Sequence, residues 1–95
     1  MDVAALELFL AVARQGSFAA AAKDRDLDPS SVSRVIAGLE AEIGVRLFQR
    51  STRRLALTEA GSLYRTRIES VMDEMRRAAA EAANISAAPS GTLRL

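Results

Sequence analysis

The short connection between two predicted helices limits the fold of this chain more than any other feature of its sequence. Asp28-Pro29 is a typical helix start, because Asp accepts hydrogen bonds from free backbone N–H groups and Pro suits the first helical position. The Ala-rich segment before it is typical of another helix, ending near Arg25, so only residues 26–28 separate the two. Helices joined this tightly must cross at a steep angle to share a core, which predicts a helix-turn-helix unit.

Apolar spacing and caps predict three short helices in the first half of the chain. Residues 3–15 have one apolar helical face, made by Leu6, Phe9, Leu10 and Ala13. Residues 29–43 have another, made by Val32, Ile36, Leu39 and Ile43. Gly16 stands where a left-handed C-terminal cap is expected, and Gly44 is expected to end the helix 29–43. The Ser17 hydroxyl suits the cap of a helix at 18–25.

The pattern changes after Gly44. The segments 46–49 and 55–57 alternate partly between apolar and polar residues, and the stretch 50–54 between them is polar. This pattern predicts a small β-hairpin, which must pack on the helices because a lone hairpin is only marginally stable. We expect its apolar side chains to be core, namely Leu47, Phe48, Leu55 and Leu57.

A long helix is predicted next, from a Thr58 cap to about Ala87, before Pro89 and Gly91. It carries a heptad stripe that could pack on its own domain, on a second copy or on a further part of a longer chain. Its length favours a partner helix, because a lone helix would expose a large apolar patch. We therefore expect a homodimer, with these interface residues: Tyr64, Ile68, Val71, Met72, Met75, Ala78, Ala82 and Ile85.

The charge distribution indicates a nucleic-acid partner, although the net charge is only +1. Between Gly44 and Arg67 there are six arginines and one acid, Glu59. Arg suits phosphate oxygens and guanine edges. Small hydroxyls and Arg34 lie off the apolar face of the helix 29–43, where they can approach a major groove. The alternative is that the serines are caps and the arginines are ordinary surface residues.

We expect double-stranded DNA to be bound by the helix 29–43 and by the hairpin tip as a basic wing. The candidate DNA-binding residues are Ser17, Pro29, Ser30, Ser31, Ser33, Arg34, Arg50, Ser51, Thr52, Arg53 and Arg54. The predicted fold is mainly α, a winged helix-turn-helix of three helices and a small hairpin followed by a long dimerisation helix. A protein-interaction module, with the last helix as its working surface, is the alternative function.

Several functions are disfavoured by what the sequence lacks. It has no Cys and no His, and therefore neither thiolate chemistry nor the commonest metal ligand and general base. It has no phosphate-binding glycine motif, no signal peptide and no apolar run long enough for a membrane span. We expect a cytoplasmic protein that is not an enzyme and uses no metal or other cofactor.

The chain resembles the N-terminal domain of LysR-type transcriptional regulators of bacteria over essentially its whole length. The matching stretches are Leu6–Ala13, Gly16–Ala22, Val32–Ile36, Leu39-Glu40, Gly44–Arg50 and Leu57–Gly61. Together and in this order they are far more specific than any one alone. The resemblance implies a winged helix-turn-helix, a long linker helix that dimerises, and an effector-binding domain beyond this chain.

The resemblance also implies roles for particular residues. Ser30, Ser33 and Arg34 would contact DNA from the recognition helix, and Arg53 and Arg50 from the wing. Relatives often have a polar residue where this chain has Val35, which could meet a thymine methyl instead. The predicted units are 1–58 for DNA binding, 59–88 for the linker helix, and 89–95 for a linker and the start of an absent effector domain. Small-molecule effectors would bind only that absent domain.

Overall fold

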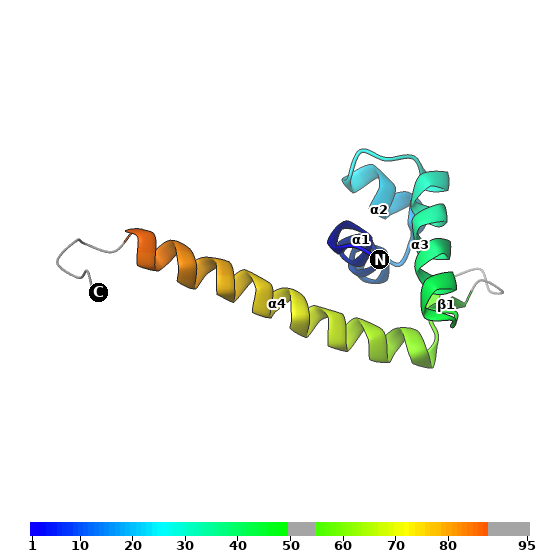
Figure 1. Ribbon diagram of the computed structural model, residues 1–95. Coiled ribbons are helices and arrows are strands. Elements are labelled where there is room, and N and C mark those ends of the chain that lie inside the picture. The colour runs from blue at the N-terminus through cyan, green and yellow to red at the C-terminus, as the bar shows by residue number, and fades with distance from the viewer. Residues whose placement is uncertain (50–54, 88–95) are drawn as a thin grey trace.

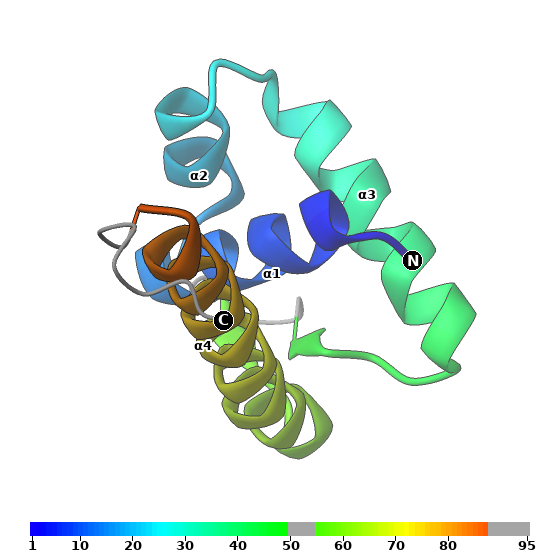
Figure 2. The ribbon, with the colours of Figure 1, turned by 60° about the vertical axis from the view of Figure 1, so that its left-hand side comes forward.

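The computed structural model describes residues 1–49 and 55–87. Within these ranges the elements are α1 (Val3–Gln15), α2 (Phe18–Asp24), α3 (Pro29–Ile43), β1 (Phe48–Gln49), β2 (Ala56–Leu57) and α4 (Glu59–Ala87). Helices α1, α2 and α3 form a bundle, and α4 extends away from it as a long arm (Figures 1 and 2). The predicted mainly helical, winged helix-turn-helix architecture is confirmed.

Local caps set the helix ends where the sequence predicts them. Gly16 and Gly44 adopt left-handed backbone angles, with φ of 71° and 86°, and end α1 and α3. The Ser17 hydroxyl accepts a hydrogen bond from the Ala20 N–H, and Asp28 accepts one from the Ser31 N–H. These side chains satisfy N–H groups that the first helical turn leaves without partners.

The turn between α2 and α3 contains Asp26 in the left-handed region, at φ 59°. The Leu27 N–H donates to the Ala22 carbonyl at 2.8 Å, and the Asp26 N–H donates to the Lys23 carbonyl at 3.3 Å. This pair of bonds is a Schellman motif, which reverses the chain within a few residues. Helix α2 accordingly ends at Asp24, one residue before the predicted end at Arg25, which is its C-cap.

The core lies where α1, α3, β1 and the first half of α4 meet. Phe9 is fully buried, and its ring centroid lies 5.5 Å from that of Phe48 and 5.4 Å from that of Tyr64. Ile68 and Met72 of α4 belong to the same buried cluster. The core therefore crosses the expected boundary between residues 58 and 59, and α4 is part of the folded unit where it begins.

The two strands are shorter than the predicted segments 46–49 and 55–57. Among the described residues of the hairpin, two antiparallel pairs form, Phe48 with Leu57 and Gln49 with Ala56. Leu47 lies outside the ladder because its N–H donates to the Glu40 carboxylate and its carbonyl accepts from the Thr58 N–H. Leu47 and Phe48 are buried as expected, while Leu55 and Leu57 are half-buried against the core.

Candidate nucleic-acid interface

The start of α3 carries an exposed network of polar side chains. Asp28 Oδ1 accepts hydrogen bonds from the Ser30 hydroxyl at 2.5 Å and the Ser31 N–H at 3.0 Å. Its Oδ2 accepts from the Ser31 hydroxyl at 3.1 Å. Arg34 Nη2 in turn donates to the Ser31 hydroxyl oxygen at 3.4 Å. The chain of bonds Asp28–Ser31–Arg34 orders the side chains along the first turn of the helix.

These hydrogen bonds stabilise the ionised form of Asp28. Its pKa is lowered from 3.8 to about 2, with the Ser30 hydroxyl as the largest cause and the Ser31 N–H as the next. Hydrogen bonds to a carboxylate favour its charged form. Asp28 is therefore a full negative charge at neutral pH, within a surface predicted to face DNA.

Most predicted residues of α3 and its cap lie on the surface. Pro29, Ser30 and Arg34 are exposed, and Ser31 and Ser33 are half-buried. Val35 is exposed on the flank of α3, where it lines a hollow with Leu27 and residues of the start of α1. Ser17 is half-buried, and its hydroxyl oxygen accepts from the Ala20 N–H at 3.1 Å. The exposed face of α3 is thus centred on Arg34.

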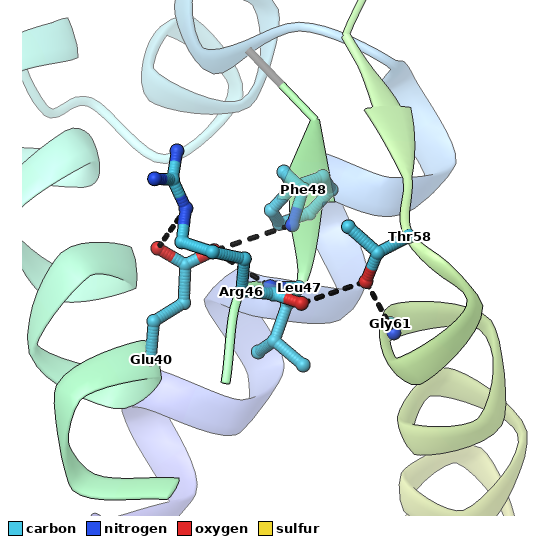
Figure 3. Close-up of polar contacts among 6 residues, drawn as sticks. All are labelled: Glu40, Arg46, Leu47, Phe48, Thr58 and Gly61. Atoms are coloured by element: carbon cyan, nitrogen blue, oxygen red, sulfur yellow. Dashed lines mark hydrogen bonds and ion pairs between the residues drawn. The ribbon is translucent and has the colours of Figure 1, made fainter. Parts of the chain in front are cut away.

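Glu40 is a site residue that the candidates drawn from the sequence do not include. Its side chain is 6% exposed. Glu40 Oε2 accepts hydrogen bonds from the Leu47 N–H at 2.7 Å and the Phe48 N–H at 3.2 Å, and Oε1 lies 3.8 Å from Arg46 Nε (Figure 3). The helical spacing could have identified it, because Ile36, Leu39 and Ile43 place position 40 on the buried face of the helix. Glu40 fixes the entry to β1 against α3.

Thr58 fixes the other side of the same segment. Its hydroxyl donates to the Arg46 carbonyl at 2.7 Å and accepts from the Gly61 N–H at 2.9 Å (Figure 3). Its N–H donates to the Leu47 carbonyl at 2.9 Å. Side chains from α3 and the start of α4 therefore hold one short stretch, 46–48, between them. This stretch leads into the strand that carries the predicted wing.

The wing residues themselves lie outside the described residues. They are Arg50, Ser51, Thr52, Arg53 and Arg54. The described residues on either side of this segment are Gln49, in β1, and the half-buried Leu55. The predicted contacts of the wing with DNA remain predictions.

Helix α4 divides the predicted dimer residues between two faces. Ile68 and Met72 are buried in the core of their own chain, and Tyr64 is half-buried. Burial raises the pKa of Tyr64, and the negative charge of Glu42 adds to that effect. The other five are exposed and form what we term the distal stripe: Val71, Met75, Ala78, Ala82 and Ile85. At 3.6 residues per turn, the two faces lie about 60° apart around the helix.

The described residues offer no metal site and no membrane span. Among residues 1–49 and 55–87, no group of three or more potential His, Cys, Asp or Glu ligands gathers in one place. Over the same ranges, no helix is both long and apolar enough to cross a bilayer.

A helix-turn-helix whose third helix is exposed at its start, with a hairpin held against its end, defines a winged helix-turn-helix protein. The sequence model of the bacterial regulatory helix-turn-helix proteins of the lysR family matches residues 3–62. The chain belongs to this family.

Curated relatives carry regulator names. The chain is 39% identical over 87 residues to an HTH-type transcriptional regulator of Xanthomonas campestris pv. campestris, covering 92% of this chain and 25% of that protein. It is also 39% identical over 90 residues to the regulator CrgA of Neisseria meningitidis serogroup C, covering 95% of this chain and 30% of CrgA. The chain thus spans less than a third of the length of these relatives.

Solved structures on DNA share the fold. The BenM DBD in complex with benA site 1 DNA matches with a TM-score of 0.89 and 25% identity, over 94% of this chain and all of that one. The CbnR DBD–DNA complex matches with a TM-score of 0.83 and 31% identity, over 90% of this chain and 99% of that one.

Proposed function

We propose that this chain is the DNA-binding part of a transcriptional regulator and reads an imperfect palindrome as a homodimer. Helix α3 would enter the major groove, and the wing 49–54 would lie along the adjacent backbone or minor groove. The observation that carries the proposal is the exposed start of α3, where Arg34 is exposed and donates a hydrogen bond to the Ser31 hydroxyl oxygen. Similarity to domains solved on DNA supports it.

The distal stripe supports a dimer. Every residue of α4 from Asp73 to Ser86 is exposed, and an isolated helix of this length is marginal in water. Apolar side chains repeat along it at spacings of three and four residues, which is the seam of a two-helix contact. A second copy would cover this seam and present a second α3 to the next half-site.

We assign the chain no catalytic step and no cofactor, and we place it in the cytoplasm, where bacterial DNA is found. Its relatives are named as regulators, which act by binding. Small-molecule effectors would act through a domain outside these 95 residues. The residue ranges 1–58 and 59–88 then mark functions, DNA binding and dimerisation, that share one core.

In vitro selection from randomised duplexes at about 150 mM salt tests this function, because non-specific phosphate binding is weak there. We expect enrichment of a short motif with two-fold symmetry. Enrichment of no motif by the folded, dimeric chain would contradict the proposal.

A further inference from the structure

We propose that Asp28 sets the hydrogen-bond polarity of the serines at the start of α3, so that Ser30 accepts a hydrogen bond from an adenine or cytosine amino group. The inference rests on the proposed function, because it concerns the surface that would enter the major groove. It names one chemical feature of the DNA that this surface selects.

The geometry fixes where the hydroxyl protons lie. An ionised carboxylate only accepts hydrogen bonds. The Ser30 hydroxyl, 2.5 Å from Asp28 Oδ1, and the Ser31 hydroxyl, 3.1 Å from Oδ2, must therefore both act as donors to it. Each serine hydroxyl has a single hydrogen, so neither has one left for another partner.

Ser30 consequently presents lone pairs to its surroundings. Phosphate oxygens only accept hydrogen bonds, so Ser30 cannot donate to the DNA backbone without breaking its bond to Asp28. The donors on base edges in the major groove are the amino groups of adenine N6 and cytosine N4. Ser30 is exposed, and its free lone pairs match these groups. An exposed serine that would otherwise donate or accept is thereby limited to accepting.

Ser31 uses the same arrangement differently. Its hydrogen points to Asp28, and one of its lone pairs accepts from Arg34 Nη2 at 3.4 Å. The remaining guanidinium donors of Arg34 stay available for a guanine edge. Asp28 is thus a positioning residue. Through Ser30 it presents a hydrogen-bond acceptor, and through Ser31 it orients the donors of Arg34.

Removing the charge of Asp28 has different expected effects on DNA binding if Asp28 is only a cap and if it sets the polarity of the serines. A carboxylate near phosphates weakens binding to every DNA sequence alike, and Asn caps a helix about as well as Asp does. If Asp28 were only a cap, removing its charge would tighten binding uniformly. If Asp28 sets polarity, the same change alters which base is preferred.

The test compares Asp28→Asn, Ser30→Ala and Asp26→Asn with the parent chain on duplexes that differ by single base pairs from the selected site. The amide oxygen of Asn that caps the Ser31 N–H carries no charge, so Asp28→Asn weakens the bond that holds the Ser30 hydrogen and frees this hydroxyl to donate. The amide nitrogen in place of Oδ2 no longer accepts from the Ser31 hydroxyl. We expect the preference for adenine or cytosine at one position per half-site to fall about fivefold or more. Ser30→Ala should lose the same preference. Asp26→Asn removes a charge two residues away and should leave it unchanged, since Asn tolerates the left-handed backbone.

The inference would be overturned if Asp28→Asn tightened binding to every duplex alike and kept the base preferences of the parent chain. The parent chain could also prefer particular bases at several positions, with no preference for adenine or cytosine that depends on Ser30. That result would overturn the inference and leave the proposed function standing. A parent chain without any base preference would overturn both. Thermal melting follows folding, and if Asp28→Asn does not fold, the loss or retention of the preference in Ser30→Ala decides.

Discussion

A Cβ atom at Gly61 would lie 2.0 Å from the carbonyl oxygen of Leu47, so the first turn of α4 is in direct contact with the backbone that leads into β1. That oxygen also accepts a hydrogen bond from the Thr58 N–H, which keeps it in place. Helix α4 and the segment that leads into β1 are therefore joined by a contact that only glycine permits.

Gly61→Ala should destabilise the chain by about 3 kcal/mol, because the new methyl group overlaps backbone atoms that cannot move independently. Gly38→Ala is the matched control, since a Cβ at that helical glycine meets nothing within 4 Å. It should stabilise the chain by about 0.5–1 kcal/mol through helix propensity. Urea unfolding measures both changes, and equal effects would contradict the contact.

Glu40→Ala should cost about 2–3 kcal/mol, because it leaves the buried N–H groups of Leu47 and Phe48 without their acceptor. Glu42→Ala, two residues away on the same helix, removes an exposed carboxylate paired with the Met1 ammonium. That surface pair is worth about 0.2–1 kcal/mol. Chemical unfolding of both variants should separate them clearly, and a small loss for Glu40→Ala would show that Glu40 does not hold the backbone of Leu47 and Phe48.

The helix ends were predictable because their signals are local. Gly16, Ser17, Asp28 and Gly44 each act on a backbone within four residues, and the structure has them as caps. Glu40 was not recognised because its partners, Leu47 and Phe48, come seven and eight residues later, in a loop whose path the sequence does not specify.

The sequence predicted the apolar stripe of the last helix but did not separate its core residues from its exposed ones, for a different reason. One apolar periodicity serves both the core of the chain, through Ile68 and Met72, and the distal stripe. Two faces about 60° apart overlap on a helical wheel, so spacing alone does not separate them. The wing arginines and the dimer contacts remain predictions.

The Asp28 cap should make stability depend on pH in the acid range. A pKa lowered in the folded state gives stability that is complete above the unfolded value of 3.8 and is lost as pH falls through about 2. Asp28→Asn keeps an acceptor for the Ser31 N–H but does not titrate. The parent chain should therefore lose stability relative to Asp28→Asn between these pH values, as followed by circular dichroism. An unchanged difference would contradict the lowered pKa.

Met75→Glu should weaken self-association about a hundredfold or more, because it buries a charge in the distal stripe of a dimer. The monomer should stay folded and keep weak half-site binding, since Met75 lies outside the core. Ala80→Glu adds the same charge on the opposite side of α4 and should leave the dimer intact. Sedimentation measures both, and a dimer that tolerates Met75→Glu would place the interface elsewhere.

The central claim, that the exposed face of α3 reads DNA sequence, is tested most directly by the affinity ratio between the selected site and a scrambled duplex. For the parent chain this ratio should be about 10³ or more at physiological salt. Arg34→Ala should reduce the free-energy difference behind this ratio by about 1–3 kcal/mol for each base pair that Arg34 contacts. Arg53→Ala should weaken binding to both duplexes alike and leave the ratio unchanged. A ratio that Arg34→Ala leaves unchanged would contradict the account.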